Sequence, residues 1–156
     1  MTQQDTLGPV ENAVGYVLKQ AAVALRNAMD AALRPLHLTV PQYACLELLG
    51  ERPGLSNAEL ARGTFVTRQS MNIVLRGLQE RGLVTRPAVA LRGRELPTAL
   101  TPAGREHLDA ASAAVLGVEK RMCGDLTPER RQALLETLAA CVRNLTGPGR
   151  TDAPAA

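Results

Sequence analysis

The stretch from Leu55 to Leu83 constrains the fold of this chain more than any other. Ser56 and Glu59 have the S-x-x-E spacing of a capping box, in which the two side chains satisfy free N–H groups at the start of a helix. That helix is predicted to run for about two turns and to end before Gly63. Thr67 then supplies a hydroxyl that caps a second helix. Two short helices joined by a tight turn indicate a helix-turn-helix.

The second of these helices is predicted to be amphipathic and to end at Glu80–Gly82, because glycine suits a helix C-cap. Its apolar residues recur at i, i+3, i+4 and i+7 and therefore share one face. At about 100° per residue, the opposite face is mostly polar. The side chains predicted to contact DNA are those of Thr67, Arg68, Gln69, Ser70, Asn72, Ile73 and Arg76.

These residue types favour a recognition helix, since arginine pairs with guanine, and asparagine or glutamine with adenine, in the major groove. Seven arginines but only one acid, Glu80, lie between Arg62 and Arg94, although the net charge of the whole chain is only +3. Such a local basic cluster attracts phosphates. We therefore expect double-stranded DNA as a partner. The alternatives are an ordinary solvated helix face and a winged module that binds only protein.

A two-stranded ribbon is predicted after the recognition helix. Leu83–Arg86 forms one strand and Glu95–Leu100 the other, where Pro97 suits an edge strand because it cannot donate to a ladder. Arg92 and Arg94 flank a glycine at the tip. A ribbon in this position is a wing, and the arginines favour a DNA contact. The alternative is a plain surface hairpin.

Four longer helices are predicted around this segment. The first runs from Pro9 to Leu33, the second from the Thr39–Gln42 capping box to Gly50, the third from Thr101 to about Gly124, and the last begins at Thr127.

The apolar stripes of the terminal helices are too extensive for a small winged module to cover. We therefore expect residues 9–36 and 101–146 to form a helical dimerisation region around a winged helix-turn-helix domain at 38–100. Packing against the first helix of the same chain is the alternative. Residues 1–8 and 147–156 are predicted to be disordered tails.

Several functional classes are disfavoured by what the sequence lacks. It contains no G-x-S-x-G, H-E-x-x-H, P-loop or G-x-G-x-x-G motif, so we expect neither an enzyme nor a cofactor. The two histidines, His37 and His107, lack ligand spacing, so no metal site is expected. The absence of a signal peptide and of a long apolar run predicts a cytoplasmic protein with no membrane partner.

The chain resembles the MarR family of bacterial transcription regulators. The residues that carry the resemblance, in order and spacing, are Leu38–Gln42, Ser56–Ala61, Phe65–Asn72, Leu78–Val84 and Leu100–Gly104. The resemblance implies a mostly α fold with a small β-wing, in which long terminal helices form a homodimer. It also implies binding to a pseudo-palindromic operator, usually as a repressor. One departure is that Arg92 stands where many members have an aspartate that helps fix the wing arginine, here Arg94.

The resemblance further implies release from DNA by a small phenolic or lipophilic ligand, or by oxidation of a cysteine. Tyr16, His37 and Tyr43 are candidates to line an effector pocket, with ordinary packing as the alternative. A redox-responsive repressor would sense oxidants through Cys45. No neighbouring Lys, Arg or His in the sequence lowers its pKa, however, and such cysteines are commonly small buried hydrophobes.

Overall fold

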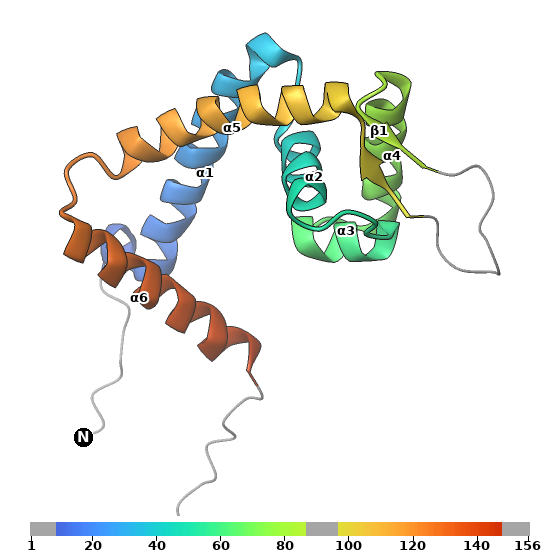
Figure 1. The fold of residues 1–156 in the computed structure, drawn as a ribbon. Helices are drawn as coiled ribbons and strands as arrows, with labels where there is room; N and C mark the ends of the chain where they lie inside the picture. The colour runs from blue at the N-terminus through green and yellow to red at the C-terminus, as the bar shows by residue number, and fades with distance from the viewer. Residues whose placement is uncertain (1–8, 87–96, 148–156) are drawn as a thin grey trace, which may run out of the picture. The chain divides into compact units, whose positions relative to one another are not determined.

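The computed structural model of this protein describes residues 9–86 and 97–147. A 3-10 turn, η1 (Val10–Asn12), precedes α1 (Val14–Leu33), and a second turn, η2 (Arg34–Leu36), leads into α2 (Val40–Glu51). They are followed by α3 (Asn57–Thr64), α4 (Arg68–Glu80), β1 (Val84–Thr85), β2 (Ala99–Leu100), α5 (Pro102–Met122) and α6 (Pro128–Thr146) (Figure 1). The mostly α fold with a small β-sheet is the class that the sequence predicts.

The chain divides into two compact units, residues 1–119 and residues 120–156. The first unit contains α1 to α4, the sheet and most of α5, and the second contains the end of α5 and all of α6. No residue of α6 is buried. The predicted tails, residues 1–8 and 147–156, lie outside the described residues except for Gly147.

Two helices begin at the predicted capping boxes. Thr39 accepts the Gln42 N–H at 3.3 Å, while the Thr39 N–H donates to Gln42 Oε1 at 3.0 Å. Ser56 accepts the Glu59 N–H at 3.2 Å, and the Ser56 N–H donates to Glu59 Oε2 at 2.7 Å. These reciprocal bonds satisfy N–H groups that a helix start leaves free.

Two predicted helix ends are wrong. The second helix continues through Gly50 to Glu51, and the first helix of the helix-turn-helix continues through Gly63 to Thr64. A Cβ atom at Gly50 would crowd Leu108 of α5, and one at Gly63 would crowd Leu48 of α2. Both glycines therefore allow neighbouring helices to approach closely, which is a packing role that resembles a stop signal in the sequence.

The first helix and the strands are also shorter than predicted. The α-helix α1 begins at Val14, after the separate turn η1, rather than at Pro9. In the sheet, β1 pairs antiparallel with β2, with Val84 opposite Leu100. Leu83 does not extend β1, because its N–H donates to the Leu78 carbonyl and so belongs to the end of α4. The predicted strand at 95–100 is regular only over its last two residues, and its first two lie outside the described residues.

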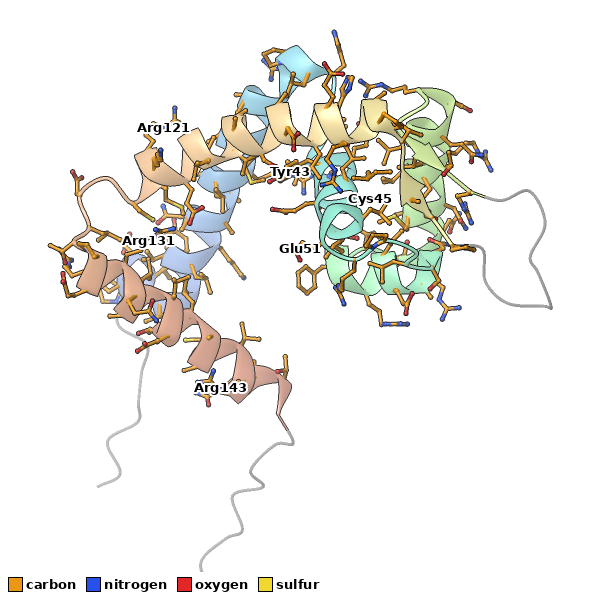
Figure 2. The ribbon with its side chains drawn as sticks, viewed as in Figure 1. Tyr43, Cys45, Glu51, Arg121, Arg131 and Arg143 are labelled. Carbon is orange, nitrogen blue, oxygen red and sulfur yellow. The ribbon has the colours of Figure 1, made fainter. Side chains whose placement is uncertain are left out.

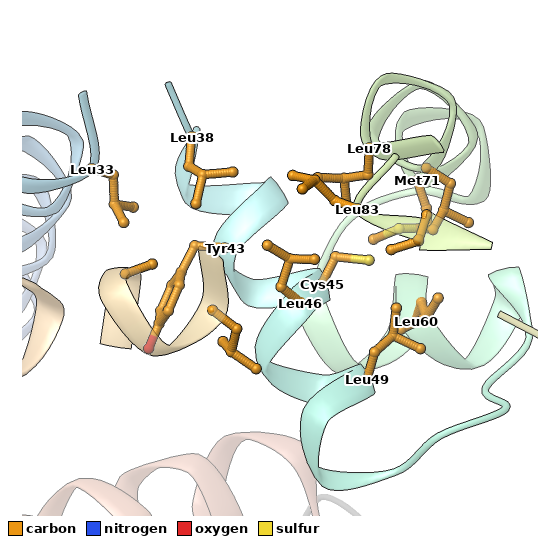
Figure 3. Packing of buried hydrophobic residues seen from close by; sticks show 14 of the residues in the cluster. Leu33, Leu38, Tyr43, Cys45, Leu46, Leu49, Leu60, Met71, Leu78 and Leu83 are labelled. Carbon is orange, nitrogen blue, oxygen red and sulfur yellow. The ribbon is translucent and has the colours of Figure 1, made fainter. Parts of the chain in front are cut away.

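A leucine-rich core holds α2, α3 and α4 together with the start of α5 (Figure 3). Its fully buried side chains include those of Leu46, Leu60, Met71, Leu75 and Leu78. Burying each such side chain stabilises the fold by about 1.5–3 kcal/mol. The core therefore fixes the two helices of the helix-turn-helix with respect to each other.

The start of α5 is attached to the base of the wing by Thr101. Its hydroxyl donates to the Gly82 carbonyl at 2.6 Å and accepts the Gly104 N–H at 3.0 Å. Gly104 is buried so closely against the Leu83 carbonyl that any Cβ atom there would overlap it. This contact gives a physical reason for the glycine in the Leu100–Gly104 motif.

Candidate nucleic-acid interface

The turn between α3 and α4 is set by local hydrogen bonds. Phe65 adopts a left-handed conformation with φ of 59°, and its N–H bonds to the last turn of α3. Thr67 then caps α4, since its hydroxyl oxygen accepts the Ser70 N–H at 3.0 Å. The Thr67 hydroxyl also donates to the Ser70 hydroxyl oxygen at 3.0 Å. Thr67 and Ser70 therefore hold the start of α4 in place.

The helix α4 is anchored by one face and exposed on the other. Met71, Leu75 and Leu78 are completely buried in the core. All seven residues of α4 and its cap that were predicted as DNA contacts are exposed: Thr67, Arg68, Gln69, Ser70, Asn72, Ile73 and Arg76. Even the apolar side chain of Ile73 is 68% exposed. Because the apolar face of α4 is completely buried in the core, the helix presents its polar face to solvent.

A hydrogen bond between α3 and α4 holds one of these exposed side chains. Asn57, the first residue of α3, donates from Nδ2 to Asn72 Oδ1 at 2.7 Å. The same Nδ2 group lies 3.4 Å from the Arg68 carbonyl oxygen. Asn72 is thus positioned by the other helix of the helix-turn-helix as well as by its own backbone.

The base of the wing is fixed, whereas its tip lies outside the described residues. Thr98 is completely buried, and its N–H donates to the Leu55 carbonyl while its own carbonyl accepts the Gly54 N–H. These bonds join the segment before α3 to the strand that returns from the wing. The predicted contacts Arg92 and Arg94 fall within residues 87–96, which are not described.

The three candidate effector residues have different environments. Tyr16 is exposed on α1, beside a shallow groove lined by Lys19, Gln20, Val23, Ala24 and Asn27. It lies 17 residues from Leu33 at the far end of that helix, or about 25 Å at 1.5 Å per residue. His37 is exposed in a left-handed conformation just beyond that far end. Because they lie at opposite ends of α1, Tyr16 and His37 are too far apart to line one small pocket.

Tyr43 is buried at the packed end of α2 and already has a polar partner. Its hydroxyl donates to Glu47 Oε1 at 3.1 Å. Burial raises the pKa of the Tyr43 hydroxyl, a hydrogen bond with Ser112 lowers it, and the Glu47 carboxylate raises it further. The group is therefore a neutral donor, as expected of a packing residue with a satisfied polar tip.

Cys45 lies midway along α2 (Figures 2 and 3). The thiol is completely buried among core leucines, and burial raises its pKa to about 12. The thiolate is the reactive form of cysteine, and burial in apolar surroundings suppresses it. The environment of Cys45 is that of an inert structural cysteine.

The described part of the chain contains no group of three or more His, Cys, Asp or Glu side chains that could hold a metal ion. Nor does any helix within residues 9–86 and 97–147 have the length and apolarity needed to cross a membrane.

Sequence reasoning missed two residues whose side chains join α4 to other elements. Asn57 is one, because only the packing angle of α3 against α4 brings it to Asn72. Arg81 is the other, since its guanidinium contacts carbonyl groups more than 40 residues away in the sequence. The only sequence signal was their position at helix ends, which many residues share.

Comparisons with known proteins agree with this geometry. A family model described as the MarR family matches residues 37–95. The HTH-type transcriptional repressor Rv2887 of Mycobacterium tuberculosis is 45% identical over 130 residues, covering 81% of this chain and 94% of the repressor.

Solved structures of that Mycobacterium tuberculosis protein show the same fold. Its complex with DNA has a TM-score of 0.71 and 40% identity, covering 83% of this chain and 97% of the other. Its complex with p-aminosalicylic acid has a TM-score of 0.69 and 41% identity, covering 83% of this chain and 98% of the other. With the family model, the relative and the fold in agreement, this chain belongs to the MarR family.

Proposed function

We propose that this protein is a dimeric transcription regulator that represses genes by binding a pseudo-palindromic operator and leaves it when a small phenolic acid binds. The observation that carries the proposal is the helix α4, whose apolar face is completely buried and whose polar face is exposed. Support comes from the relative named a transcriptional repressor and from its solved complexes with DNA and with p-aminosalicylic acid.

In this proposal α4 enters the major groove. Arg68, Gln69, Asn72, Ile73 and Arg76 face the base edges and the nearby phosphates. Thr67 and Ser70 lie at the helix N-terminus, where Thr67 orients the Ser70 hydroxyl, and that hydroxyl and the free backbone N–H groups suit a phosphate.

We extend the proposal to the wing, where Arg92 and Arg94 contact phosphates beside the major-groove site. Replacing both arginines with alanine should lower affinity and reduce the slope of log K against log salt by about one to two. An unchanged slope would exclude phosphate contacts by the wing. The double variant Arg121→Ala/Arg130→Ala, at two exposed arginines far from the wing in the sequence, removes the same amount of positive charge and is the control.

Dimerisation is proposed through the terminal helices, residues 9–36 and 101–146, leaving 38–100 as the DNA-binding domain. On α1, Val14 and Val17 are 75% and 49% exposed, and on α6, Val142 and Leu145 are 59% and 86% exposed. Apolar side chains in such stripes suit a partner helix, and a second copy of the chain supplies an identical set. A two-fold dimer also provides two recognition helices for the two half-sites, about 34 Å apart.

Ligand control is proposed to act at the junction where α1 and α2 meet the start of α5. The candidate residues there are His37 and Tyr43, with Tyr16 contributing only from the exposed surface of α1. A ligand weakens operator binding only if it prefers the conformation that does not fit DNA. Sensing by Cys45 is the second candidate, but its buried thiol gives that mechanism no support. We propose no catalytic role, since the relatives are transcriptional regulators.

The test begins with selection of binding sites from a pool of duplexes with a randomised centre. The proposal predicts a pseudo-palindromic site bound by two protomers. Titration with salicylate should then weaken operator binding by about tenfold, which corresponds to about 1.4 kcal/mol of coupling. Benzoate, which lacks the hydroxyl, is the matched control ligand. Recovery of no preferred sequence would overturn the DNA-binding proposal, and an unchanged affinity with salicylate would overturn the choice of ligand.

A further inference from the structure

The amide of Asn72 has a definite direction, which can be deduced from its neighbours. The nitrogen and oxygen ends of an amide are distinguished by their hydrogen-bond partners. Asn57 Nδ2 faces the Arg68 carbonyl oxygen at 3.4 Å, and a backbone carbonyl only accepts. The end of Asn57 that faces it must therefore be the NH₂ group. That group also lies 2.7 Å from Asn72, so the Asn72 atom there is the acceptor Oδ1.

The opposite direction is disfavoured by burial. Asn57 Oδ1 is buried and has no hydrogen-bond partner among the described residues. If the Asn57 amide were reversed, its NH₂ group would occupy that unpartnered position and its oxygen would face the Arg68 carbonyl. Buried N–H groups without partners are rarer in proteins than carbonyl oxygens with unused lone pairs. The observed direction is therefore the more stable of the two.

We propose that Asn57 is a positioning residue that turns the NH₂ group of Asn72 toward DNA, so that Asn72 reads hydrogen-bond acceptors on the bases. This inference rests on the proposed function. With Oδ1 of Asn72 held by Asn57, the exposed end of the side chain carries only donors.

The four bases differ in the hydrogen-bond acceptors and donors that they present in the major groove. Guanine presents two adjacent acceptors, O6 and N7, and thymine presents O4, whereas the single acceptor of adenine, N7, lies beside its N6 amino donor. Adenine is recognised by an asparagine that offers both ends of its amide, one as donor and one as acceptor. An Asn72 side chain that presents donors therefore favours guanine or thymine at its base. Residue type alone suggests that Asn72 prefers adenine, whereas the direction of its amide predicts guanine or thymine.

The substitution Asn57→Asp reverses the direction of Asn72. A carboxylate only accepts, so the Asn72 NH₂ group turns inward toward it and Oδ1 turns toward DNA. The outward oxygen accepts from the amino groups of adenine or cytosine. Because an acidic residue in the first turn of a helix interacts favourably with the helix dipole, α3 is expected to keep its structure in this variant.

The experiment compares base preference, since a general loss of structure or charge lowers affinity for all sequences alike. Sites are selected from the randomised duplex pool with wild type and N57D, and affinities are measured on duplex pairs that differ at one base pair. In N57D, the preference at one position per half-site should move from guanine or thymine toward adenine or cytosine by about fivefold or more. The double variant N57D/N72A should lose that shift.

Two further variants complete the test. N57A removes the bond without adding charge, and it should bring the affinities for duplexes that differ at the same position close to one another. Q79E adds a negative charge on the exposed end of α4, and it should weaken binding without changing base preference. The inference is overturned if N57D and N57A keep the wild-type preference. If the wild type itself selects no sequence, the proposed function fails instead.

Discussion

Arg81 holds the backbone of His37, joining the end of α4 to the junction between α1 and α2. Its Nη1 donates to the His37 carbonyl oxygen at 2.6 Å, and Nη2 donates to the neighbouring Leu36 carbonyl oxygen at 3.3 Å. His37 has a left-handed conformation with φ of 53°, which few residues other than glycine adopt readily. The guanidinium thus stabilises an unfavourable turn between the proposed dimerisation helix and the DNA-binding domain.

Replacing Arg81 with alanine should lower the free energy of unfolding by about 1–2 kcal/mol, since two charge-assisted bonds are lost at an exposed site. Lysine should not restore the loss, because an ammonium group does not reproduce the planar fork of arginine. The measurement is urea denaturation followed by circular dichroism. Arg121→Ala at the end of α5 is the control, and equal effects of the two substitutions would show that the Arg81 bonds contribute nothing.

Gly104→Ala should destabilise the protein strongly, by about 3 kcal/mol or more, because its Cβ atom would overlap the Leu83 carbonyl group of the backbone. Gly117, on the same helix, has nothing within 4 Å of a built Cβ atom. Gly117→Ala should therefore be neutral or stabilising, by up to about 1 kcal/mol. Thermal unfolding of both variants provides the comparison. Similar melting temperatures would contradict the packing of α5 against the wing.

The capping box of α3 should make stability depend on pH. The Ser56 backbone and side-chain hydrogen bonds lower the pKa of Glu59. A lowered folded pKa stabilises the protein above the unfolded value, about 4.3, and this contribution disappears as the pH falls through the folded value. The melting temperatures of wild type and Glu59→Gln should therefore differ more at pH 6 than at pH 3. A difference that grows on acidification would contradict this assignment.

Cys45 should not react in the native protein. Because burial raises the pKa of its thiol to about 12, iodoacetamide at neutral pH should label Cys45 only after unfolding in urea. Peptide mass spectrometry identifies the labelled cysteine. Peroxide should affect operator binding by the wild type and by Cys45→Ser equally. Rapid native labelling of Cys45, or peroxide release that the serine variant abolishes, would restore the redox mechanism.

The starts of α2, α3 and α4 were predictable from the sequence because capping is local. Thr39, Ser56 and Thr67 each bond to a residue three positions later, so spacing alone reveals them. The buried face of α4 was predictable for a similar reason, since helical periodicity determines which residues share a face.

Contacts between distant segments were not predictable in this way. Gly50 and Gly63 look like helix ends in the sequence, and only the positions of Leu108 and Leu48 reveal their packing role. The bond from Asn57 to Asn72 likewise depends on how α3 crosses α4. The polar face of α4 could therefore be identified from the sequence, but the direction of an amide on that face could not.

If the exposed face of α4 reads DNA sequence, the protein must distinguish a selected duplex from a scrambled duplex of equal composition. Fluorescence anisotropy at physiological salt should show the wild type binding the selected duplex about a thousandfold more tightly. Arg76→Ala should lose about 1–3 kcal/mol on the selected duplex and much less on the scrambled one. Equal affinity of the wild type for the two duplexes would show that α4 does not read DNA sequence.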